Sequence, residues 1–133
     1  MSTPDLTPAE MIAAAQRLCY PRALGFGHSA GSVACALLSA GGHLYYGVCI
    51  DVSSGIGFCA EHAAIAAMVT AGETAIAKIV AVGEGGRVLP PCGRCREFMA
   101  QVDESNLAHT EVILGEHWVV CLADLLPHPY VGV

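Results

Sequence analysis

The chain has 133 residues, of which 54% are hydrophobic and only 14% are charged, and its formal net charge is −6. No apolar run reaches the roughly 18 residues of a membrane span, and six basic residues are too few for the basic surface that binds nucleic acid. We therefore expect a single domain over residues 1–133 that acts on a small-molecule substrate, without nucleic-acid or membrane partners.

The cysteine count and the N-terminal sequence indicate a compartment. Seven cysteines, an odd number, argue against a disulfide scaffold, and the first residues lack the basic and apolar segments of a signal peptide. We expect a cytoplasmic protein with reduced thiols and no signal peptide. The hydrophobic fraction exceeds the roughly 45–50% of an average soluble chain, which favours a homo-oligomer that buries the excess apolar surface.

The first predicted element is a helix that begins at Thr7 and Pro8. Thr7 can cap the helix, Pro8 has the φ that the first turn requires, and Glu10 completes a capping box. We expect this helix to run to about residue 19. Residues 21–31 include a proline and three glycines, and this composition predicts a loop.

Apolar runs and turn residues predict the remaining elements in chain order. They are strands over residues 32–39 and 44–52 joined by a glycine-containing hairpin turn, a loop over 53–57, a buried helix over 59–71, a strand over 77–83, a helix from 92 to about 102, strands over 110–114 and 118–121, and a short helix over 123–126. This order predicts an α/β fold, a layered sheet with helices on its faces.

Three cysteines and one glutamate form the most specific motif. Cys59 and Glu61 open the predicted helix over 59–71, while Cys92 and Cys95 lie one turn apart at the start of the next helix. The free N–H groups of a helix N-terminus lower the pKa of a thiol placed there. A first Cys or His ligand, a glutamate two residues later and a distant Pro-Cys-x-x-Cys together are typical of zinc-dependent deaminases.

Each part of this motif has a chemical task in a hydrolytic site. Thiolates of Cys59, Cys92 and Cys95 would hold Zn²⁺ and leave its fourth position open for water. Glu61 could take a proton from that water, whose pKa zinc lowers to about 7, and pass it to a leaving amine. The backbone N–H of Ala60 could hold a substrate carbonyl. Three thiolates leave the cluster negative, and neighbouring arginines at 94 and 96 could compensate for that charge.

The motif resembles that of the cytidine deaminase family in its three-cysteine form. The flanking segments resemble the blasticidin S deaminase subfamily in particular; they include Gly47-Val48, the strand over 79–83, Pro-Cys-Gly-Arg-Cys-Arg at 91–96 and the segment 124–131. The resemblance covers about residues 32–131. It implies a mixed five-stranded sheet with helices on both faces, a homotetramer, and hydrolysis of the cytosine moiety of cytidine or deoxycytidine to uracil and ammonia.

The sequence departs from the family where the sugar should bind. Family members carry Asn-x-Glu at the end of the second strand, whereas this chain has Cys49-Ile50-Asp51. Asp51 can accept a hydrogen bond from a hydroxyl or a cationic amine, but Cys49 is a poor substitute for an amide. These positions leave open a second substrate class, a nucleoside antibiotic such as blasticidin S or another aminated heterocycle.

Three other interpretations of the cysteines stay open. Cys92 and Cys95 alone would suit a redox pair, although Cys59 and Glu61 disfavour that reading. His62, which stands where three-cysteine family members often have arginine, could be the fourth ligand of a purely structural zinc. The chain could also be a non-catalytic, zinc-stabilised binding module.

Overall fold

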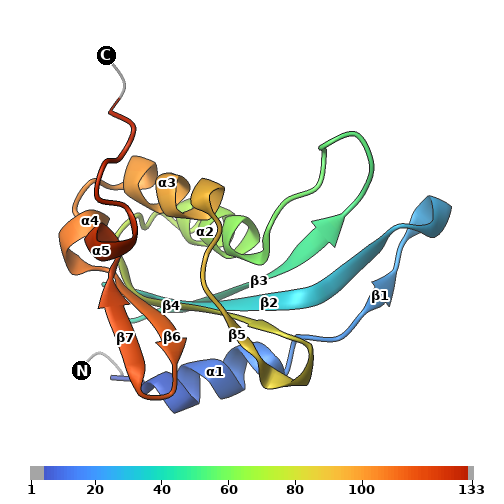
Figure 1. Cartoon of the computed structure of the whole chain (residues 1–133), viewed down its shortest axis with the longest axis horizontal. Helices are drawn as coiled ribbons and strands as arrows, with labels where there is room; N and C mark the ends of the chain where they lie inside the picture. Colours follow the sequence, from blue (N-terminus) through green and yellow to red (C-terminus); the bar gives the residue numbers. More distant parts are fainter. Residues whose placement is uncertain (1–4, 132–133) are drawn as a thin grey trace.

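The computed structural model describes residues 5–131, which form one sheet with helices on both of its faces (Figure 1). Residues 1–4 and 132–133 lie outside the described part, and with them most of the N-terminal segment in which we expect no signal peptide. Among the described residues, no helix combines the length and the apolar character that crossing a bilayer would require.

The sheet is mixed, as the resemblance to the cytidine deaminase family implied. Its strands are β1 (Arg22–Ala23), β2 (Ser29–Ser39), β3 (Leu44–Asp51), β4 (Ile76–Gly83), β5 (Val88–Leu89), β6 (Glu111–Gly115) and β7 (Trp118–Cys121). Five of them form the main path in the order β3-β2-β4-β6-β7, in which β4 and β6 are parallel and the other neighbours antiparallel. The short strands β1 and β5 pair with β2 and β4.

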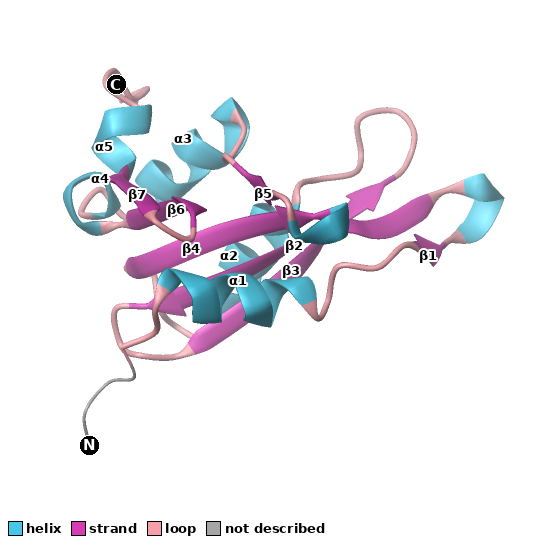
Figure 2. Ribbon diagram, turned by 60° about the horizontal axis from the view of Figure 1, so that its bottom comes forward, coloured by secondary structure: helices cyan, strands magenta, loops and turns pink. Residues whose placement is uncertain are grey.

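Helices cover the two faces of this sheet and bury two clusters of apolar side chains. Helix α1 (Pro8–Gln16) lies on one face, and α2 (Ala60–Thr70) and α3 (Gly93–Val102) lie on the other (Figure 2). The short helices α4 (Asn106–His109) and α5 (Leu122–Leu125) flank β6 and β7. Residues of β2 alternate between the clusters, Leu37 toward α2 and Leu38 toward α1, as the period of a strand requires.

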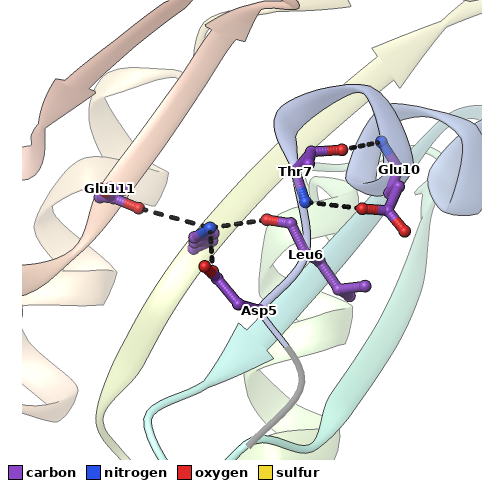
Figure 3. Close-up of polar contacts among 6 residues, drawn as sticks. Asp5, Leu6, Thr7, Glu10 and Glu111 are labelled. Carbon is purple, nitrogen blue, oxygen red and sulfur yellow. Dashed lines mark hydrogen bonds and ion pairs between the residues drawn. The ribbon is translucent and has the colours of Figure 1, made fainter.

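A capping box starts α1, as predicted. The Thr7 hydroxyl accepts a hydrogen bond from the Glu10 N–H at 3.2 Å, and the Glu10 carboxylate accepts one from the Thr7 N–H at 3.1 Å (Figure 3). Just before this cap, the Lys78 ammonium from β4 donates to the Asp5 carboxylate at 2.9 Å and to the Leu6 carbonyl at 2.6 Å. These contacts fix the start of the described chain to the sheet.

The predicted loop over residues 21–31 is partly strand, so that prediction was wrong in part. Ser29 and Ala30 pair on one side with β1 and on the other with the end of β3, and β2 therefore begins at Ser29. Pairing with distant segments outweighs the local preference of the glycines in this stretch. Helix α1 also ends earlier than expected, at Gln16.

Helix α2 lies unusually close to β3, and Gly47 permits the contact. A Cβ atom at Gly47 would collide with the Ala60 carbonyl, with the backbone nitrogen of Ala64 and with the Ala63 side chain. Only a residue without a side chain lets the helix pack directly on the strand backbone at this point. The first turn of α2 is thereby held at a fixed height above β3.

Candidate active site

Two helix N-termini bring the three predicted cysteines together. Cys59 is the N-cap of α2, Cys92 is the N-cap of α3, and Cys95 lies in the first turn of α3. The Sγ atom of Cys92 lies 3.5 Å from that of Cys59 and 3.5 Å from that of Cys95. Within residues 5–131, these three form the group of Cys, His, Asp or Glu side chains close enough to hold one metal ion.

The spacing of the sulfurs fits zinc. Thiolates on a tetrahedral zinc, each about 2.3 Å from the metal, lie about 3.8 Å apart. The observed separations of 3.5 Å need only a small expansion to admit the ion. Three sulfur donors leave one tetrahedral position for a non-protein ligand, which is the arrangement of catalytic rather than structural zinc sites.

His62 supports one of the sulfurs instead of completing the ligand set. Its Nδ1 atom lies 3.3 Å from the Sγ of Cys95, and its ring stacks on that of Phe98 with centroids 4.5 Å apart. It does not belong to the metal-holding group formed by the described residues. Burial, and then the charge of Arg94, lower the pKa of His62, so the neutral ring is favoured.

The three thiols differ in acidity without a metal. Burial raises the pKa of Cys59, and burial followed by the charge of Glu61 raises the pKa of Cys95. Burial acts in the same direction on Cys92, but hydrogen bonds from the N–H groups of Cys95 and Arg94 and from the neighbouring thiols lower its pKa on balance. Metal binding requires thiolates, so it would release protons from this cluster and strengthen as the pH rises.

Glu61 lies beside the cluster in the first turn of α2 and is only 5% exposed. Burial raises the pKa of this carboxyl, while hydrogen bonds, one of them with Cys95, pull the pKa back in part. A carboxyl group in this setting is suited to accept and return a proton during a reaction. It faces a cavity, so a bound molecule can reach it.

The cavity has a volume of about 500 Å³ and contains most of the site residues expected from the sequence. Its lining includes Cys49, Asp51, Cys59, Ala60, Glu61 and Cys92, and Cys95 completes the metal cluster beside it. As the first residue of α2, Ala60 has a backbone N–H without a partner inside the helix, so that group can donate to a ligand.

Cys49 and Asp51 form the wall contributed by β3. The Cys49 sulfur contacts the Ser32 hydroxyl at 3.3 Å and accepts from the Val33 N–H at 3.3 Å. The Cys49 thiol also lies 3.5 Å from the Asp51 carboxylate. Asp51 is exposed, whereas Cys49 is buried. Sequence reasoning missed Ser32: it predicted that β2 and β3 form a hairpin, but not the register, shifted between Ala30 and Ala34, that places the Ser32 hydroxyl beside Cys49.

The two arginines expected to offset the thiolate charge have different surroundings. Arg94 is exposed and lines the cavity. The Arg96 guanidinium instead donates to the carbonyls of Pro91 at 2.8 Å and of Leu125 at 3.1 Å. Arg96 thus ties the loop before α3 to α5, and its hydrogen bonds are used on backbone oxygens.

Known proteins resemble this chain in sequence over most of its length. The sequence matches no family profile. It is 32% identical to the cytidine deaminase of Halalkalibacterium halodurans over 100 residues, which cover 71% of this chain and 74% of that protein. It is also 32% identical to the cytidine deaminase of Mycobacterium tuberculosis over 80 residues, which cover 60% of this chain and 57% of that protein.

Crystal structures of cytidine deaminases resemble the fold of this chain over nearly its whole length. The crystal structure of cytidine deaminase from Mycobacterium tuberculosis superposes with a TM-score of 0.78 and 26% identity, covering 96% of this chain and 99% of that one. The crystal structure of cytidine deaminase from Burkholderia pseudomallei gives a TM-score of 0.73 and 27% identity, covering 94% and 100% of the two chains.

Proposed function

We propose that this chain, which belongs to the cytidine deaminase family, is a zinc-dependent hydrolase that converts the cytosine moiety of cytidine or deoxycytidine to uracil with release of ammonia. One observation carries the proposal: a cluster of three sulfurs with zinc spacing, two of them in the lining of a cavity, lies beside a buried carboxylate of the same lining. The family membership supports the same reaction.

We assign the metal to Cys59, Cys92 and Cys95. Zinc held there would supply Lewis-acid activation of a water molecule, lowering the pKa of that water to about 7. The donor set supports this assignment, because thiolates suit zinc and the cluster leaves one position open.

Glu61 is the proposed proton carrier. Its carboxylate takes a proton from the attacking water and delivers it to N3 of the ring; it then takes the second proton from the hydroxyl added at C4 and gives it to the departing amine. Water adds at C4 and the bond from C4 to the exocyclic nitrogen breaks, which yields the uracil ring and ammonia. The Ala60 N–H donates to the ring carbonyl, and Cys49 and Asp51 form the sugar side of the site.

We also propose the domain organisation, the oligomeric state and the compartment of the protein. We take residues 1–133 to be one cytidine deaminase-like domain that assembles as a homotetramer in the cytoplasm. The high apolar content supports assembly, since 54% of the residues are hydrophobic. None of the seven cysteines is bridged in the structure, and unbridged thiols suit a reducing compartment.

The proposal is tested by ammonia release from the zinc-loaded protein with cytidine and deoxycytidine. Glu61→Gln keeps the size of the side chain but cannot carry a proton, and it should lower kcat by about 10²-fold or more. Zinc content and circular dichroism should stay unchanged. Glu116→Gln, in the exposed turn between β6 and β7, is the matched control and should retain full activity.

Other outcomes would assign the protein differently. Turnover of adenosine, guanine or free cytosine, or of the nucleoside antibiotic blasticidin S, but not of cytidine or deoxycytidine, would replace the substrate class proposed here. A zinc-loaded protein that releases no ammonia from any of these compounds would be a binding module. If Glu61→Gln retained its turnover, the proton would have to pass through another group.

A further inference from the structure

The side chain of Leu89 lines three hollows that meet beside the reacting groups. The first is the cavity of about 500 Å³ that contains Glu61. The second is a hollow of about 280 Å³ toward the turn between β4 and β5, and Leu89, Ser32 and Val33 belong to the lining of both. The third is a small space of about 10 Å³ beside Glu61. Among the described residues, only Leu89 lines all three.

Backbone pairing and packing fix where the Leu89 side chain points. Leu89 is the last residue of β5 and pairs with Ala81 of β4, which also lines the cavity. Val88, the other residue of β5, points to the opposite face and packs against the apolar cluster beneath α1. A Cβ atom at Gly83 would lie 3.2 Å from Leu89 Cδ1, so the leucine side chain rests on the backbone of β4. Leu89 therefore forms part of the wall between the cavity and the second hollow.

The proposed reaction leaves one edge of the substrate ring for this wall. It uses the Ala60 N–H for the ring carbonyl, Glu61 for N3 and the cysteine cluster for C4. C5 lies across the ring from the carbonyl carbon and C6 lies across from N3, so the edge from C5 to C6 faces away from Ala60 and Glu61. C5 is also bonded to C4, and Leu89 stands three residues before Cys92 on the segment that leads into α3 (Figure 1). The group at C5 would therefore face Leu89.

We propose that Leu89 selects among cytosine nucleosides by excluding substituents at C5 of the ring. A hydrogen atom at C5 fits against the leucine side chain, whereas a larger group needs the space that this side chain fills. With alanine at position 89 the cavity and the second hollow would join, and the substituent would enter the added space. This inference rests on the proposed deaminase function and identifies a residue of the same site that determines specificity.

The test compares three cytosine nucleosides that differ in the group at C5. Zinc-loaded protein is given cytidine, 5-methylcytidine and 5-propynylcytidine, and kcat/KM is measured by ammonia release. In the unaltered protein 5-propynylcytidine should fall at least about tenfold below cytidine, with 5-methylcytidine between them. Leu89→Ala should raise the ratio of 5-propynylcytidine to cytidine by about tenfold or more. Comparing this ratio between variants cancels the intrinsic reactivities of the two substrates.

Two further variants distinguish this role from a general loss of structure. Val88→Ala shortens the neighbouring aliphatic side chain of the same strand on the opposite face, and it should leave the ratio unchanged. Leu89→Val shortens the side chain less and should give an intermediate ratio; it decides the question if circular dichroism shows that Leu89→Ala is unfolded. A ratio near one in the unaltered protein, or a ratio that the folded Leu89 variants leave unchanged, would overturn the inference.

A binding measurement separates this inference from the proposed reaction. Cytidine and 5-propynylcytidine are titrated calorimetrically into zinc-loaded Glu61→Gln protein, with and without Leu89→Ala, so that the result does not depend on turnover. If no compound is deaminated, the proposed function fails, and the binding ratio still decides whether Leu89 excludes the C5 substituent. If cytidine is deaminated but Leu89→Ala changes neither the rate ratio nor the binding ratio, only the inference fails. A protein that neither deaminates nor binds these nucleosides would overturn both.

Discussion

At the scale of a single residue, His62 contacts one of the three cysteines proposed to hold the metal. Its Nδ1 atom lies 3.3 Å from the Cys95 sulfur, and its ring is held flat against Phe98 with an interplanar angle of 13°. With a thiolate as acceptor, the ring nitrogen is the donor. A hydrogen bond of this kind orients a ligand and disperses its charge.

Replacing His62 should therefore weaken zinc binding. We expect His62→Ala to lower zinc affinity about 10–100-fold, the usual effect of losing a partner behind a metal ligand. The measurement is competition for zinc against a chromophoric chelator, with the exposed His117→Ala as control. An affinity within about twofold of the unaltered protein would contradict a supporting role for His62.

The cysteine cluster could be predicted from the sequence because its spacing is local to two helix starts. Cys92 and Cys95 are one turn apart, and Cys59 follows a glycine-rich loop directly into a helix. The contact of His62 with Cys95 could not be predicted, since it depends on the orientation of two helices and on a ring stacked against Phe98. Contacts between side chains of different elements depend on how those elements pack, and the sequence of one segment does not specify that packing.

At the scale of elements, Asn106 joins three of them through its side chain. It is only 1% exposed, and its amide oxygen accepts from the Ile76 N–H of β4 at 2.8 Å. Its amide nitrogen donates to the carbonyls of Met99 at 2.9 Å and Thr74 at 3.1 Å. Asn106 thereby ties α4 to α3 and to the start of β4.

Asn106→Ala should destabilise the fold strongly, because three backbone groups would lose their partner in a buried setting. We expect the free energy of unfolding to fall by about 3–5 kcal/mol. Urea denaturation at constant free zinc measures it, since metal binding alone would shift stability. Gln101→Ala, an exposed amide on α3, should change the free energy by less than about 0.5 kcal/mol.

A second link, between β3 and the end of α2, should make stability depend on pH. The Tyr45 hydroxyl donates to the Glu73 carboxylate at 2.5 Å, and the His43 ring lies 3.0 Å from the same oxygen. The Tyr45 hydroxyl, with a smaller effect of His43, lowers the pKa of Glu73. The stability gained is fully present above the ordinary carboxyl pKa and is lost as the pH falls through the lowered one.

Glu73→Gln should consequently make the free energy of unfolding depend less on pH in the acid range. Chemical denaturation at a series of pH values from 7 to about 3 measures the difference between variant and unaltered protein. That difference should shrink as the pH falls below about 4.5, the ordinary value for a glutamate. A difference independent of pH would exclude this link as its source; Glu116→Gln is the matched control.

Long, periodic elements could be predicted from the sequence, and short ones could not. Helix α2 and strand β4 are apolar runs bounded by turn residues, so their existence and type follow from the local sequence pattern. The strands β1 and β5 have two residues each. A segment that short has no period of its own and becomes a strand only because β2 and β4 present free edges.

At the scale of the whole molecule, large apolar side chains remain on the surface. Phe26 at the turn between β1 and β2, Trp118 on the edge strand β7 and Tyr130 near the C-terminus are 102%, 63% and 69% exposed. Single exposed apolar side chains are common on folded proteins, and these three lie on different elements, so they do not by themselves mark an interface.

The proposed homotetramer predicts a native mass in solution near four times 13.7 kDa. Light scattering coupled to size-exclusion chromatography measures it at micromolar protein concentration, with and without zinc. A tetramer in both conditions would show that assembly does not depend on the metal. A mass equal to that of one chain would contradict the homotetramer.

Gly47 also links one position on β3 to the geometry of the pocket. A larger residue there would collide with the backbone of α2, so the fold could accommodate it only by moving the helix away from the strand. Such a shift would carry Cys59, Ala60 and Glu61 with it, because all three stand at the start of that helix. A residue that touches neither metal nor substrate thereby sets how deep the reacting groups sit.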